Sequence, residues 1–90
     1  MKIFLVERTD DGDYDQFDSF VCIAKNEHDA KHTHPDYDST DVSKENTGLW
    51  DGKKERFSEW TDIENVTATY IGEAKDDSVR SVVCSSYNAG

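Results

Sequence analysis

Four short apolar runs, separated by polar stretches rich in Asp, Ser, Thr and Gly, constrain this chain more than any other feature. The runs cover residues 2–8, 17–24, 66–72 and 79–85. Each is rich in β-branched or aromatic residues and is short, so each predicts a β-strand. Because the chain has only 90 residues, we expect the whole of 1–90 to form a single domain around one sheet.

The polar stretches between the runs indicate how the strands connect. Residues 9–16 contain Gly12 and several aspartates, which favour a turn, and residues 74–78 form a similar stretch. A short helix is expected at 27–33, with Asn26 as its N-cap and Pro35 closing it. The predicted fold is α+β: a small antiparallel sheet of two β-hairpins in the order β-β-α-β-β, with the one short helix packed on it.

The face pattern of two runs is informative. Residues 3–6 are apolar on both faces, which predicts a central strand covered on both sides at least in part. The third run alternates, with Val66, Ala68 and Tyr70 on one face.

The middle of the chain carries weaker signals. Its composition predicts a flexible loop over 36–48. A short hairpin is expected around Asp51-Gly52, since Asp-Gly is a favoured two-residue turn. The pattern from Thr61 to Glu64 matches a capping box and predicts one helical turn.

Acidity is the strongest compositional signal. Twenty Asp and Glu residues face ten Lys and Arg residues, for a formal net charge of -10. This balance argues against direct binding to nucleic acid or to an anionic membrane, since nucleic-acid binders need cations to displace phosphate counterions. It favours a partner with a basic surface, although acidity that serves only solubility explains the same composition. The candidate acidic surface consists of Asp10, Asp11, Asp13, Asp15, Asp36, Asp38, Asp76 and Asp77. If the two hairpin turns were adjacent, they would line one end of the sheet.

Two patterns resemble metal sites. Asp11, Asp13 and Asp15 have the spacing that starts an EF-hand loop, but the glycine and the closing glutamate are missing, so a turn explains them equally well. All three histidines, His28, His32 and His34, lie within seven residues. His28 and His32 share a helix face, but no zincin motif or nearby cysteine completes a site. We therefore expect no metal and no cofactor.

No motif indicates catalysis. Cys22 and Cys84 lie in strand-like runs, and both are expected to be buried free thiols. Neither has the charged or helix-terminal context of a nucleophile, and the chain has no phosphate-binding loop. We expect a protein that is not an enzyme.

Aromatic residues surround a local basic cluster in the middle of the chain. Trp50, Phe57 and Trp60 lie close to Lys53, Lys54 and Arg56. Neighbouring acids cancel the charge, so packing in the core is favoured over stacking on nucleic acid. An exposed Trp50 or Trp60 would instead be an anchor for a protein partner.

The apolar run at 3–6 is too short for a signal peptide or a membrane span, which predicts a cytoplasmic protein.

The two ends of the chain resemble small uncharacterised acidic proteins of tailed bacteriophages and prophages. The resemblance lies in DSFVCIAKNE from residue 18, His34-Pro35, IGEA from residue 71 and SSYNAG from residue 85. It brings no catalytic residues. It implies an accessory protein, acting in the host cytoplasm, that binds a host protein.

Three hypotheses follow. The first is a non-enzymatic binder of a basic host surface, with a nucleic-acid mimic or anti-defence inhibitor as its sharpest form. The alternative is a structural or assembly component of a phage particle, acting through sheet edges and aromatic contacts, and a homodimer is compatible with it. The third is an enzyme that uses the histidines.

Overall fold

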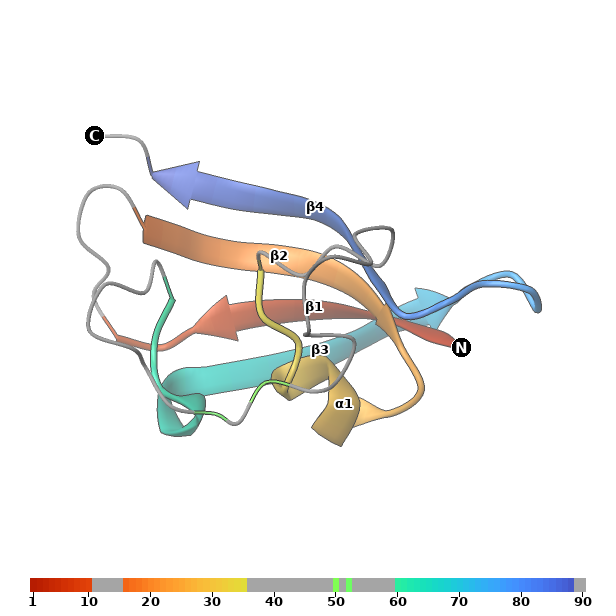
Figure 1. The fold of residues 1–90 in the computed structure, drawn as a ribbon, viewed down its shortest axis with the longest axis horizontal. Helices are drawn as coiled ribbons and strands as arrows, with labels where there is room; N and C mark the ends of the chain where they lie inside the picture. The colour runs from red at the N-terminus through yellow and green to blue at the C-terminus, as the bar shows by residue number, and fades with distance from the viewer. Residues whose placement is uncertain (11–15, 36–49, 51, 53–59, 89–90) are drawn as a thin grey trace.

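The computed structural model describes residues 1–10, 16–35, 50, 52 and 60–88. Their elements are strands β1 (Lys2–Arg8) and β2 (Gln16–Ala24), helix α1 (Glu27–Lys31), a 3-10 turn (Ile63–Asn65), and strands β3 (Val66–Glu73) and β4 (Ser81–Asn88) (Figure 1). The α+β class, with an antiparallel sheet and one short helix, is as predicted.

The sheet order is β3-β1-β2-β4, and every pairing is antiparallel. The predicted first hairpin, β1 with β2, is confirmed. The predicted second hairpin is wrong, because β3 pairs with β1 and β4 pairs with β2 at the opposite edge. Residues 74–80 connect β3 to β4 and must pass the ends of β1 and β2, which lie between them. Neighbouring strands are about 4.8 Å apart, so seven residues are long enough for this connection. The local sequence pattern of two strands around a polar stretch does not distinguish this crossing from a hairpin turn.

One face of the sheet carries the hydrophobic core. The side chains of Phe4 and Val6 from β1 point to this face, opposite Tyr70 and Ala68 of β3, so the predicted alternation of β3 is confirmed. The buried apolar residues are Phe4, Val6, Phe17, Phe20, Cys22, Ala24, Ala30, Trp60 and Val66. Trp60 is completely buried and packs edge-to-face on Phe20, with the ring centroids 5.4 Å apart. Burial of such large rings is the main source of stability in a sheet of this size.

Helix α1 begins where predicted. The Asn26 side chain accepts a hydrogen bond of 2.8 Å from the backbone N–H of Asp29, as an N-cap does. The helix ends at Lys31, two residues before the predicted end. The hydroxyl of the fully buried Thr33 donates to the carbonyl of Asp29 at 2.8 Å and tightens the last turn. Ala30 is the residue through which α1 enters the core.

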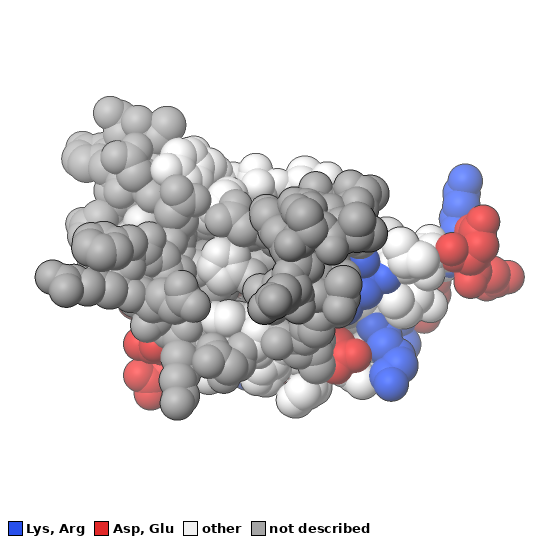
Figure 2. All heavy atoms as spheres, in the orientation of Figure 1, with Lys and Arg blue, Asp and Glu red and all other residues white. Residues whose placement is uncertain are grey.

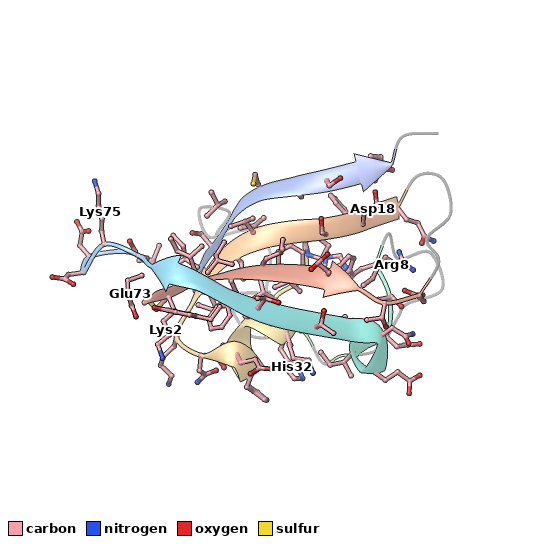
Figure 3. The ribbon with its side chains drawn as sticks, turned by 180° about the vertical axis from the view of Figure 1, so that it is seen from behind. Lys2, Arg8, Asp18, His32, Glu73 and Lys75 are labelled. Atoms are coloured by element: carbon pink, nitrogen blue, oxygen red, sulfur yellow. The ribbon has the colours of Figure 1, made fainter. Side chains whose placement is uncertain are left out.

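The other face of the sheet is shown in Figure 3, with β1 to β4 nearest the viewer and α1 behind them. Ile3 and Leu5 of β1 lie on this face beside Ile23 and Val21 of β2, and all four are partly exposed. The prediction that residues 3–6 are covered on both sides is therefore met on one side only by the described elements.

Several predictions fall in the middle of the chain. The loop at 36–48 lies outside the described residues, as does the hairpin around Asp51-Gly52 except for Trp50 and Gly52. Gly52 is buried, has φ +86°, and accepts a hydrogen bond from the backbone N–H of Ile63. The predicted capping box is wrong: the 3-10 turn starts after Asp62 and has no side-chain cap. The Thr61 hydroxyl instead donates to Asp10.

Strand β4 lies later in the sequence than predicted. It runs over Ser81–Asn88, into the predicted polar tail, and not over 79–85. Pairing with β2 explains this extension, because Tyr87 lies opposite Phe17 and their rings meet edge-to-face at 4.9 Å. A tertiary contact thus overrides the weak local strand preference of Ser and Asn.

Candidate functional site

Five acidic residues lie at the end of the sheet where β1 stops and β2 and β3 begin. We call this group the acidic end. Its members are Glu7, Asp10, Asp18, Asp62 and Glu64. The register brings them together, since Glu7 of β1 lies opposite Ser19 of β2 and Thr67 of β3. Asp18 is the extra residue of β2 at a break in its register with β4.

Arg8 is the cation within this end of the described sheet, and its charge is already engaged. Its Nε and Nη2 donate to Oδ1 and Oδ2 of Asp10 at 2.8 and 2.9 Å, a two-pronged ion pair. Its Nη1 donates to Oε1 of Gln16 at 2.7 Å, and the guanidinium lies 5.9 Å from the ring centre of Trp60. The Arg8 side chain is only 4% exposed. It therefore stabilises the end of the β1–β2 hairpin through these contacts and does not contribute a surface charge.

Asp10 ties this hairpin to a distant segment. Besides Arg8, its Oδ2 accepts a hydrogen bond of 2.9 Å from the Thr61 hydroxyl, and Thr61 accepts one from the side-chain amide of Asn65. The hydrogen bonds from Arg8, and to a lesser extent that from Thr61, lower the pKa of Asp10 to about 2 against the desolvation that opposes them. Asp10 is therefore ionised at neutral pH and is paired.

The predicted acidic surface is not gathered at one place. Asp10 lies beside the end of β1, whereas Asp76 and Asp77 follow the end of β3, and Glu73 at that end lies opposite Lys2 at the start of β1. The two groups are at opposite ends of the sheet, so the expected alignment of the two turns is wrong. The reason is the antiparallel pairing of β3 with β1, which puts the end of β3 beside the start of β1 and away from Asp10. Asp11, Asp13, Asp15, Asp36 and Asp38 lie outside the described residues.

Among the described residues, the exposed lysines lie away from the acidic end. Lys2, Lys25 and Lys75 flank the opposite end, around the start of β1, the end of β2 and the segment after β3, together with the partly buried Arg80. On the face seen in Figure 2, the visible Lys and Arg side chains lie mainly on that side, with Asp and Glu side chains among them. Sequence reasoning missed this segregation, because it arises from strand order and not from neighbours in the chain.

The two tryptophans differ in exposure. Trp60 is completely buried, which removes it as a surface anchor. Trp50 is partly buried against the core, and its ring meets the His34 ring edge-to-face at 5.9 Å. Its backbone N–H donates to the carbonyl of His32 at 2.7 Å. Trp50 itself is thus held beside the end of α1 and against the core.

The histidines lie as predicted for one helix face. The His28 and His32 rings stack with centroids 4.3 Å apart. His28 Nδ1 lies 3.2 Å from Oδ1 of Asp29, and His32 Nδ1 lies 2.8 Å from the carbonyl oxygen of His28. Among the described residues, no group of three or more His, Cys, Asp or Glu side chains is arranged to hold a metal ion.

The two cysteines have different environments, and the prediction that both are buried is wrong for one. Cys22 is completely buried, which raises the pKa of its thiol to about 12. Cys84 is exposed. They lie on adjacent strands, but Cys22 is opposite Val82 and Cys84 is opposite Val21, on different faces of the sheet. Both are free thiols.

In the described part of the chain, no helix is long and apolar enough to cross a membrane. Comparison with protein-family models, with curated proteins and with solved structures finds no match for this chain.

Proposed function

We propose that this protein is a non-enzymatic accessory protein of phage type that binds a basic surface of a host protein in the host cytoplasm. The observation that supports the proposal most directly is the acidic end. There, Glu7, Asp18 and Glu64 are exposed carboxylates, while Arg8 is buried and paired. A surface of one sign attracts an oppositely charged partner and speeds its association. The most specific version of this proposed function is an inhibitor whose carboxylates take the place of nucleic-acid phosphates.

The test is capture of host proteins from a bacterial lysate by the tagged protein, at low and then moderate salt. Two double variants remove the same charge from opposite ends: Asp18→Asn with Glu64→Gln, and Asp76→Asn with Asp77→Asn. All four side chains are exposed, so both variants are expected to fold.

We expect one dominant basic protein that is released as salt rises, because screening weakens contacts between exposed charges. The first variant should lose it and the second should retain it. Equal loss in both variants would mean that only net charge matters. No captured protein at low salt would contradict the proposal.

The alternative function is a structural or assembly component of a phage particle. The observation that favours it is β4, an edge strand among the described residues with exposed Val83 and Tyr87. Such an edge can pair with another chain, including a second copy. A concentration-dependent dimer or larger assembly in sedimentation analysis, with no captured host protein, would support this alternative.

A further inference from the structure

Strand β4 (Ser81–Asn88) is an open edge of the described sheet. It pairs with β2 alone among the described strands. Edge strands in natural proteins are commonly protected by a lysine, a proline, a bulge or short length, because their unpaired backbone groups accept another strand. These protections are mostly missing in β4, which has eight residues and neither a charged residue nor a proline.

The one irregularity in β4 is at Val83. Cys84 lies opposite Val21, and Val82 lies opposite Cys22, so Val83 is an extra residue between the two pairs. Beyond it, residues 84–88 run on without a further extra residue in β4. Val83 is 57% exposed and Tyr87 is 41% exposed, and Cys84, Ser85 and Ser86 are exposed as well. The strand therefore presents an uncharged and accessible edge in a chain of which 33% is charged.

The other edge strand, β3, is less suited to this role. Its last residue, Glu73, carries a charge and accepts a hydrogen bond of 2.8 Å from the Tyr70 hydroxyl. The Tyr70 ring, which is 51% exposed, packs edge-to-face on Phe4 of the neighbouring β1, with centroids 6.1 Å apart. The chain after β3 continues into a hydrogen bond from the Ala74 N–H to the Met1 carbonyl.

Charge indicates what kind of strand fits beside β4. The last residues of β4 lie next to the acidic end, because Asn88 is opposite Gln16 and because Asp18 is the extra residue between Phe17 and Ser19. A strand added to β4 would place its side chains about 10 Å from β2, within the distance over which charges interact at ordinary ionic strength. A second copy carries the same formal charge of -10 and is repelled, whereas lysine and arginine side chains are attracted.

We infer that β4 takes up an extended, lysine- or arginine-bearing segment of the partner protein as a fifth strand of the sheet. Backbone hydrogen bonds to β4 supply the alignment, and the Asp18 carboxylate of the neighbouring β2, the member of the acidic end nearest to β4, attracts a cationic side chain of the segment. The inference rests on the proposed function and deepens it, since it names the segment of the basic partner that binds.

The experiment uses two acetylated and amidated heptapeptides of equal charge as probes. The first, Lys-Val-Lys-Thr-Lys-Val-Lys, can form a strand. The second has the same sequence with every peptide nitrogen N-methylated, so it has the same four lysines but no backbone N–H group to donate to a ladder. Each is titrated into the isotope-labelled protein at low salt, and backbone amide shifts and amide hydrogen exchange are recorded by NMR.

For the first peptide we expect shifts along residues 81–88 and slowing of exchange at outward-facing β4 amides by about tenfold. The second peptide should shift only residues near carboxylates. Ser86→Lys should weaken binding of the first peptide by about tenfold, because it adds both a like charge and an edge-protecting lysine. Thr69→Lys is the matched control on β3, also exposed and on the same face of the sheet, and it should have a smaller effect.

Each other outcome contradicts the inference in a distinct way. If both peptides bind equally and β4 amides exchange as before, strand addition is wrong while acidic-surface binding stands. If the slowed amides lie in β3, the peptide adds to the other edge of the sheet and the assignment of β4 as the binding edge is wrong. If neither peptide binds but the lysate experiment captures a basic protein, the proposed function stands and the extended-segment inference fails. If both experiments give no binding, both fail.

Discussion

Arg8 donates two hydrogen bonds to the two carboxylate oxygens of Asp10, two residues further on, at the point where β1 ends. The pair lies over Trp60 and continues through Asp10 to Thr61, 51 residues further along the chain. It therefore joins the first hairpin to the segment that fills the core.

The ion pair should make stability depend on pH in the acid range. The pKa of Asp10 is about 2 in the folded protein and 3.8 in an unfolded chain. The stabilisation is therefore complete above pH 4 and is lost as pH falls through about 2. The Asp10 side chain is a third exposed, and solvent screening reduces the effect to about 1 kcal/mol.

Urea unfolding of the natural protein and of Asp10→Asn at several pH values checks this. The variant should be less stable at pH 7 by about that amount, and the difference should vanish near pH 2. A difference that is the same at pH 7 and pH 2 would show that the charge of Asp10 is not the cause.

Two glycines should respond oppositely to the same substitution. At Gly52, an added Cβ would lie 2.9 Å from the Cβ and Cγ2 of Ile63, and φ is +86°. Gly52→Ala should therefore lower the free energy of unfolding by about 2 kcal/mol. At Gly72 an added Cβ meets no atom within 4 Å, so Gly72→Ala should change it by less than about 0.5 kcal/mol. Thermal unfolding of both variants gives the comparison, and equal effects would contradict it.

The cysteines should react at different rates with a thiol reagent. Cys84 is exposed, while Cys22 is buried and its pKa is about 12, so little thiolate forms. One thiol per chain should react in the folded protein and two in denaturant. Cys84→Ser should abolish the reaction of the folded protein. A rapid reaction of that variant under native conditions would mean that Cys22 is accessible.

Tyr70 should titrate at a higher pH than an ordinary tyrosine. Its hydroxyl donates to Glu73, which favours the neutral phenol and raises the pKa of Tyr70. Glu73→Gln should lower this pKa toward the ordinary value of 10.0. The ring-carbon shift of Tyr70, followed by NMR against pH, measures it. Identical titration curves for the two proteins would rule out the Glu73 contact as the cause.

Much of the secondary structure could be predicted from local sequence, because strand preference and helix capping are local effects. Asn26 is a clear case, since its role as an N-cap depends only on the next three residues. The strand order could not be predicted in the same way. Whether residues 74–80 turn back or cross the sheet depends on how β4 packs against β2, and the ring contact of Tyr87 with Phe17 appears only in three dimensions.

The candidate site shows the same division. Net charge predicted an acidic surface, but the grouping of Asp18 with Glu64 follows from strand pairing across distant parts of the sequence. Arg8, a single cation followed by an aspartate-rich turn, was a signal for an ion pair at that turn. The Thr61 hydroxyl gave no such signal, because the capping pattern offered it a local role that it does not take.

The strand order also determines which parts of the protein unfold locally and which unfold together. The hairpin of β1 and β2 occupies the centre, and each later strand adds to one side of it. β3 contributes the buried Val66, whereas β4 is joined to β2 alone and holds no fully buried apolar side chain among its described residues. Opening β4 therefore exposes little core. We expect the amides of β4, and the β2 amides bonded to it, to exchange through this local opening, while the amides that join β1 to β2 and β1 to β3 exchange through global unfolding. We therefore expect β1, β2 and β3 to unfold as one cooperative unit and β4 to open and close by local unfolding.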